Sequence, residues 1–179
     1  MAQLPHLVYE QKPPMSSKDF KDLAKPLLFK KDMILLEALS LEFKEFSKTG
    51  CRFIDSWHEW ESDLRIYIAR QRMVKLKKDN IDIPEPTAFH LEASATATKA
   101  SDEHSPLEAE IIIDKARWNA IEGFTGNDYF DRSNVFAYYL KLLILERRQA
   151  FDPEIGFAEY KSLYASIVES GQVSRGEFK

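Results

Sequence analysis

The sequence predicts an all-α fold, and three observations lead to that prediction. Only 6 of the 179 residues are glycine, which disfavours a turn-rich β fold. Apolar residues recur every three or four positions over several stretches, and this is the period of an amphipathic helix. Residues that favour helix starts precede these stretches. We expect a helical bundle of about six helices, in two three-helix halves joined by a low-complexity linker.

The composition is that of a globular cytoplasmic protein. Hydrophobic residues make up 44% and charged residues 30% of the chain. A net charge of -4 argues against a general nucleic-acid binder, which would normally carry a basic excess. Cys51 is the single cysteine, so an intramolecular disulfide framework is excluded. We also expect no signal peptide and no membrane-spanning segment, because no apolar run approaches the required length.

Residues 1–78 are predicted to hold an extended arm followed by three helices. Three prolines lie in the arm, residues 4–15, and they favour an extended or turn-like backbone. Ser16 is a helix-capping residue type and begins the first helix start signal. Pro26 would end or kink that helix.

Two longer helices are predicted to complete this first half. One runs from Asp32 to about Lys48, with Gly50 as a plausible residue just past its end. The other starts at a capping box, Ser56–Glu59, in which the serine hydroxyl and the glutamate carboxylate would bind otherwise unpaired amides. This third helix is expected to reach Lys78.

Residues 79–104 are predicted to form a flexible linker or surface loop. Pro84 and Pro86 disfavour a helix at its start. The tract 92–101 consists almost entirely of small and polar residues, which bury too little apolar surface to offset the entropy of ordering them. The alternative, that this alanine-rich tract forms some helix, stays open.

Residues 105–171 are predicted to hold the second group of three helices. The first begins at Ser105, where a proline follows at the first helical position and a glutamate three residues on completes a capping box. It continues to Glu122 and stops at Gly123.

The remaining two helices of this half follow in order. One starts near Asp131 or Ser133 and runs to about Ala150; because it is apolar around most of its circumference, it should lie centrally. A last helix begins after Asp152 and ends at Gly171, and residues 172–179 are expected to be a disordered tail.

The chain contains no recognisable catalytic, cofactor-binding or metal-binding pattern. No two histidines have the helical spacing of paired ligands. Cys51 has no base placed beside it by the sequence, and Gly123 and Gly126 lack the context of a phosphate-binding loop. We therefore expect no catalytic residue, no metal and no cofactor. The histidines are His6, His58, His90 and His104.

A basic run occupies the end of the third predicted helix. Residues 65–78 hold six positive and no negative charges. One interpretation is a contact for an acidic partner, for which Arg72, Lys75 and Lys78 are the candidates. The other is that cations favour the C-terminal half of a helix because they complement its dipole.

Four charged residues lie inside apolar patterns in the second half. They are candidates for ion pairs between helices, because buried charges must be paired. A structural role fits them better than acid–base catalysis, since no histidine accompanies them. These residues are Asp114, Arg117, Glu146 and Arg147.

Several segments resemble one bacterial family of uncharacterised proteins that are encoded within operons for V/A-type rotary ATPases. The most specific block runs from Ser105–Glu110 and Asp114–Trp118 to Leu145–Arg147. Other matching segments are Tyr129–Asp131 and Ala137–Leu142, together with Leu4–Leu7, Lys12–Ser16 and Trp57–Arg65.

The resemblance implies a non-catalytic subunit or accessory factor of a proton- or sodium-translocating rotary ATPase. The role would be that of the helical adaptor between the central shaft and the membrane ring. Its partners would be ATPase subunits of the central stalk or membrane ring, and it would reach the membrane only through them. The alternatives are a stand-alone helical enzyme and a general protein-interaction module. A pocket with convergent carboxylates and shifted pKa values would favour the enzyme.

Overall fold

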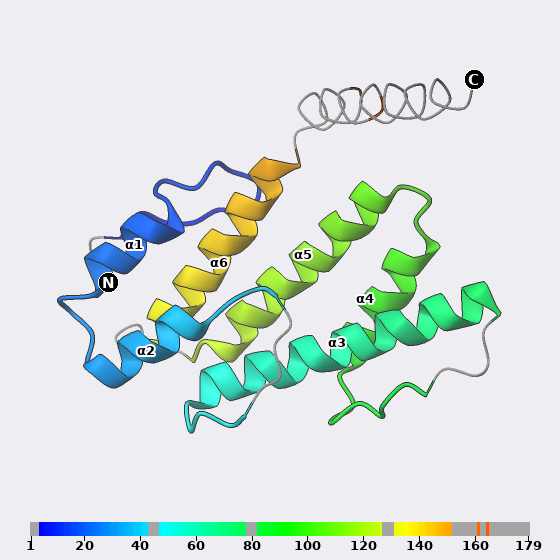
Figure 1. Cartoon of the computed structure of the whole chain (residues 1–179), viewed down its shortest axis with the longest axis horizontal. Coiled ribbons are helices and arrows are strands. Elements are labelled where there is room, and N and C mark those ends of the chain that lie inside the picture. Colours follow the sequence, from blue (N-terminus) through cyan, green and yellow to red (C-terminus); the bar gives the residue numbers. More distant parts are fainter. Residues whose placement is uncertain are drawn as a thin grey trace, which may run out of the picture. The chain divides into compact units, whose positions relative to one another are not determined.

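The computed structural model confirms the all-α prediction. Across the residues that it describes there are six α-helices and no strand (Figure 1). The described residues are 4–42, 47–77, 82–126 and 131–151, with Lys161 and Tyr164. The helices are α1 (Ser17–Ala24), α2 (Lys30–Ala38), α3 (Arg52–Leu76), α4 (Leu91–Asp102), α5 (Pro106–Phe124) and α6 (Arg132–Ala150).

The chain divides into two compact units. Residues 1–146 form the first unit, which contains α1 to α5 and all but the last turn of α6. Residues 147–179 form the second, in which Lys161 and Tyr164 are helical. The rest of the last predicted helix, from residue 152, and the predicted tail, residues 172–179, lie outside the described residues. The architecture discussed below is that of the first unit.

Helices α3, α4 and α5 pack against one another. The side chains of Gln71 and Thr98 are joined by a hydrogen bond of 3.2 Å, and the amine of Lys75 donates to the carbonyl of Ser101. These contacts follow the same order along α3 and α4, so the two helices run parallel. Helix α5 follows α4 after a short connection and packs on both (Figure 1).

Residues 91–102, predicted as part of a flexible linker, form helix α4. Ala93, Ala97 and Ala100 recur at helical spacing on one face and are buried in the first unit. Alanine has the highest intrinsic helix propensity, and its small side chain lets neighbouring helices pack closely. The linker prediction is therefore wrong for α4, because it counted only the apolar surface that the tract itself supplies.

Helix α2 is shorter than predicted. It ends at Ala38, and the described residues that follow it up to Gly50 are not helical, so the predicted continuation to Lys48 is wrong there. Residues 43–46 lie outside the described part. Gly50 has a positive φ of 75°, but it precedes α3 instead of ending α2.

Helix α3 begins one turn earlier than predicted. Its N-cap is Cys51, so the predicted capping box at Ser56 is wrong and Ser56 lies inside the helix. The reason is Asp55 in the first turn. Its carboxylate accepts hydrogen bonds from the Thr49 amide and hydroxyl, both 2.8 Å, and from the Gly50 amide at 3.2 Å. The loop before α3 is thereby held against the first turn.

The other predicted helix starts agree with the structure. The Ser16 hydroxyl accepts a hydrogen bond from the Asp19 amide (3.0 Å), and Ser105 is the N-cap of α5 with Pro106 at the first helical position. Helix α5 passes through Gly123 to Phe124, two residues beyond the predicted end. Helix α6 agrees with its predicted bounds and buries apolar residues at nearly every turn.

The N-terminal arm has no helix, as predicted, and it packs on α5 and α6. The Tyr9 hydroxyl donates to the Ile111 carbonyl at 2.9 Å, and the Tyr138 hydroxyl donates to the Pro5 carbonyl at 3.0 Å. Helix α1 packs on α6 through stacked rings of Phe20 and Tyr138, whose centroids are 4.9 Å apart. The arm and α1 therefore cover one side of α6 (Figure 1).

None of the helices in the described part of the chain is long and apolar enough to cross a bilayer.

Candidate functional site

A buried charge cluster joins α3 to α5. Arg117 donates two hydrogen bonds to the carboxylate of Glu61, of 2.9 and 2.8 Å, and one of 2.9 Å to Asp114. All three side chains are buried. The structure thus brings Asp114 and Arg117, both singled out in the sequence, together with Glu61, which the sequence analysis did not select.

The guanidinium of Arg117 is held firmly in its charged form. Burial alone would lower its pKa, but hydrogen bonds and charges from Glu61 and Asp114 outweigh this effect and raise the pKa above its ordinary value. Glu61 also accepts a 2.8 Å bond from Arg65, whose guanidinium reaches the Leu41 carbonyl at 2.9 Å. The cluster therefore ties three parts of the chain together: α3, α5 and the segment after α2.

A second buried acid, Asp63, holds the segment that leads from α3 to α4. Its carboxylate accepts hydrogen bonds from the amides of Thr87 (2.7 Å) and Ala88 (3.0 Å) and contacts Nδ1 of His90 at 2.9 Å. The side chain of Asp63 is fully buried. Sequence analysis missed this residue, although an aspartate inside the apolar stripe of α3 is the signal that could have revealed it.

Two further acids fix the first two helices against α6. Asp32 on α2 is buried and forms an ion pair of 2.8 Å with Arg132. The hydrogen bond from Asp32 raises the pKa of Arg132. Glu146 accepts a 2.6 Å hydrogen bond from the amide of Ser17, where a carboxylate complements the positive end of α1.

Arg147, the fourth ion-pair candidate, lies in the second unit. Its guanidinium is 5.6 Å from the ring centroid of Phe151. This is a cation–π distance.

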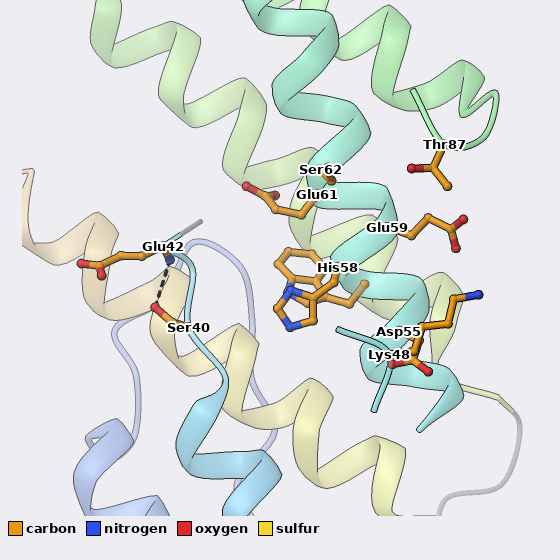
Figure 2. Close-up of a pocket in the computed structure, with 10 residues that line it drawn as sticks. Ser40, Glu42, Lys48, Asp55, His58, Glu59, Glu61, Ser62 and Thr87 are labelled. Carbon is orange, nitrogen blue, oxygen red and sulfur yellow. Dashed lines mark hydrogen bonds between the residues drawn. The ribbon is translucent and has the colours of Figure 1, made fainter. Parts of the chain in front are cut away.

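A polar pocket of about 280 Å³ opens beside the first turns of α3. Most of the side chains that line it project from α3, while Ser40 and Glu42 approach from the segment after α2 and Thr87 from the segment before α4 (Figure 2). The indole Nε1 of Trp57 is buried and has no hydrogen-bond partner. The lining residues are Ser40, Glu42, Lys48, Asp55, Trp57, His58, Glu59, Glu61, Ser62 and Thr87.

The pocket holds one imidazole among several carboxylates. Burial lowers the pKa of His58, and the nearby charges of Asp55 and Glu61 oppose the shift only in part. His58 is therefore mainly neutral at pH 7. Both carboxylates already serve structural contacts: Asp55 binds the Thr49–Gly50 turn and Glu61 binds Arg117.

Hydrogen bonding also sets the pKa of Asp55. Partial burial would raise it, but the hydrogen bonds from Thr49 and Gly50 and the charge of Lys48 outweigh burial and lower it. Asp55 is thus ionised at neutral pH and unsuited to act as an acid. Its role in the pocket wall is to hold the preceding turn.

A smaller opening of about 300 Å³ lies between α2, the start of α3 and the start of α6. Its charged side chains are Lys31, Asp32 and Arg132, and the last two are paired with each other. Cys51, at its wall, is buried. Within the described residues, no group of three or more His, Cys, Asp or Glu side chains could hold a metal ion.

The predicted basic interface is only partly presented to solvent. Arg72 is exposed on α3. Lys75 is exposed too, but its amine bonds to the Ser101 carbonyl and lies 3.6 Å from the Asp102 carboxylate. Arg70 is likewise engaged, with a 2.8 Å ion pair to Glu85. Lys78 lies outside the described residues.

Comparison with known proteins finds one family. A family model described as a protein of unknown function (DUF2764) matches residues 89–170, a little under half of the chain. The matched range includes Asp114 and Arg117 and leaves out α1, α2 and α3. This chain is thus similar to an uncharacterised family over α4, α5 and α6. No curated protein and no solved structure matches the chain.

Proposed function

We propose that this protein is a non-catalytic subunit or accessory factor of a V/A-type rotary ATPase, acting as a helical adaptor between the central shaft and the membrane ring. Two things support the proposal. The first is the resemblance to proteins from ATPase operons, and its most specific block lies inside the range that the family model matches. The description of that family names neither an ATPase nor a partner, so the link rests on the resemblance.

The second support is the end of α3, which is the observation that carries a partner-binding role. This helix has 25 residues and is roughly 37 Å long at 1.5 Å per residue. At its C-terminal end Val74 is 70% exposed and Leu76 is 64% exposed, beside the exposed cations Arg72 and Lys77. Large apolar side chains next to cations suit a partner with an acidic, partly apolar surface.

The packing behind this end suits a spacer that transmits force. The buried cluster around Arg117 and the buried carboxylate of Asp63 hold α3 to α5 and to the start of α4. A helix fixed along its length in this way can pass a displacement at one end to its neighbours without unfolding. Arg72 remains our interface residue, whereas Lys75 serves the contact between α3 and α4.

The alternative of a stand-alone enzyme rests on the pocket beside His58. A neutral imidazole in a polar pocket is suited to accept a proton. The two carboxylates that most affect its pKa are, however, bound to Thr49 and to Arg117. The proposal therefore favours the adaptor.

Gentle affinity purification of the tagged protein, from cells that express the ATPase, tests the proposal. We expect ATPase subunits to be recovered with the wild-type chain and lost with an Arg72→Glu/Leu76→Ser variant. The matched control is Lys115→Glu, which reverses an exposed charge on α5 and should keep the partners. Recovery of the wild-type chain without any ATPase subunit would overturn the proposal.

A further inference from the structure

The connection between α1 and α2 exposes an unusual set of large apolar side chains. We call residues 21–34 the α1–α2 corner. Leu27 is 83% exposed and Phe29 is 77% exposed, and both lie between the two helices. Leu23 on α1 and Ile34 on α2 are more than half exposed as well. Such a cluster of exposed apolar groups marks a surface that contacts something other than water.

The backbone of the corner is already hydrogen-bonded within itself. The amides of Leu27 and Leu28 donate to the Ala24 carbonyl, at 2.9 and 3.0 Å, and the amides of Asp32 and Met33 donate to the Phe29 carbonyl at 2.9 and 3.0 Å. Pro26 has no amide hydrogen to satisfy. Because these polar groups are paired, the corner could enter an apolar medium without leaving them unsatisfied.

The exposed charges around the corner are predominantly positive. Lys25, Lys30 and Lys31 are all exposed, and Asp22 is the exposed acid among these residues. Asp32 does not offset the lysines, because it is buried in its ion pair with Arg132. The corner is therefore locally basic on a chain whose net charge is -4.

The apolar and basic side chains share the same surfaces. Lys30 and Ile34 are four residues apart on α2, and this spacing places them on one face of the helix. Leu23 and Leu27 have the same spacing at the end of α1, where the hydrogen bonds to Ala24 continue the helical path. A surface that met the apolar side chains would consequently meet the lysines too.

We propose that the α1–α2 corner docks on a membrane surface that contains anionic phospholipids. Leu27 and Phe29 enter the boundary between headgroups and acyl chains, and Lys25, Lys30 and Lys31 lie among the headgroup phosphates. Lysine is depleted in the cores of protein–protein interfaces, whereas lysine beside leucine and phenylalanine is the combination found in segments that lie in the membrane interface. The contact goes beyond the adaptor role, because it reaches the lipid directly instead of through partner subunits.

Vesicle co-sedimentation of the full chain tests this proposal. We expect binding to vesicles that contain equal amounts of phosphatidylcholine and phosphatidylserine, little binding to pure phosphatidylcholine, and weaker binding at high salt. Each of Lys25→Gln, Lys30→Gln and Lys31→Gln should lower the partition coefficient about fivefold. Leu27→Ser/Phe29→Ser should lower it at least about tenfold.

The matched control is Val74→Ser/Leu76→Ser, which removes a comparably exposed apolar pair beside cations at the end of α3. It should bind the mixed vesicles as the wild-type chain does. Equal loss of binding in both pairs would overturn the assignment to the corner. Failure of the wild-type chain to bind mixed vesicles would overturn the proposal outright, and loss of a protein partner from the Leu27→Ser/Phe29→Ser variant would then assign the corner to that partner.

Discussion

Helix α4 and the α1–α2 corner treat their apolar residues in opposite ways. In α4 the apolar residues are small, yet Ala93, Ala97 and Ala100 are buried against neighbouring helices. In the corner the apolar residues are large, yet Leu27 and Phe29 are mostly exposed. The size and hydropathy of a side chain do not by themselves decide its burial. What decides it is whether a second surface of matching shape lies opposite.

The difference extends to the charges near each region. Around α4 and its neighbours, Asp63, Asp114 and Arg117 are buried and hydrogen-bonded across helices. At the corner, Lys25 and Lys30 face solvent. The first arrangement is suited to hold one conformation, and the second is suited to contact a partner surface.

Removal of the cation from the buried cluster should have the largest effect. Arg117→Met leaves Glu61 and Asp114 buried without their shared partner, and we expect a loss of about 3–5 kcal/mol in the free energy of unfolding. Urea denaturation followed by far-ultraviolet circular dichroism measures it. Lys115→Met, an exposed position on the same helix, is the control and should change the value little. A loss below about 1 kcal/mol for Arg117→Met would mean that the cluster does not hold α3 to α5.

Features set by neighbouring residues could be predicted from the sequence. The caps at Ser16 and Ser105 depend on the next three residues, and both occur where the local pattern placed them. The bounds of α6 were predictable because its apolar residues and its flanks specify the same helix. Asp114 and Arg117 stand three residues apart on one helix, so their pairing could be anticipated from spacing.

Features that depend on distant residues could not be predicted in this way. The partners of Arg117 include Glu61, 56 residues away, and Asp63 binds amides 24 and 25 residues away. The burial of α4 depends on the shapes of α3 and α5, which no pattern within residues 91–102 reports. The early end of α2 is likewise set by Leu39, a core residue whose backbone is extended.

An enlarged side chain in α4 should have the next largest effect. Ala97 is 1% exposed, so Ala97→Leu forces extra volume between packed helices, and we expect a loss of about 1–3 kcal/mol in the free energy of unfolding. Thermal and urea unfolding measure it. Ala38→Leu makes the same change at an exposed position on α2 and should be close to neutral. If both variants had equal stability, α4 would not be packed as tightly as its burial indicates, and the contrast with the corner would fail.

The smallest effect is expected where the largest apolar side chains are exposed. Leu27→Ser/Phe29→Ser should change the free energy of unfolding by no more than about 0.5 kcal/mol, because these side chains already contact water in the folded protein. The buried counterpart on the neighbouring helix is Phe20, which is 2% exposed, and Phe20→Ala should cost about 3–5 kcal/mol. Urea unfolding of the three proteins without lipid makes the comparison. A loss above about 2 kcal/mol for the corner variant would mean that Leu27 and Phe29 are covered in solution, since only buried apolar surface contributes so much. A near-neutral result would separate stability from surface contact, so that weaker vesicle binding by the same variant could be attributed to the lost contact and not to unfolding.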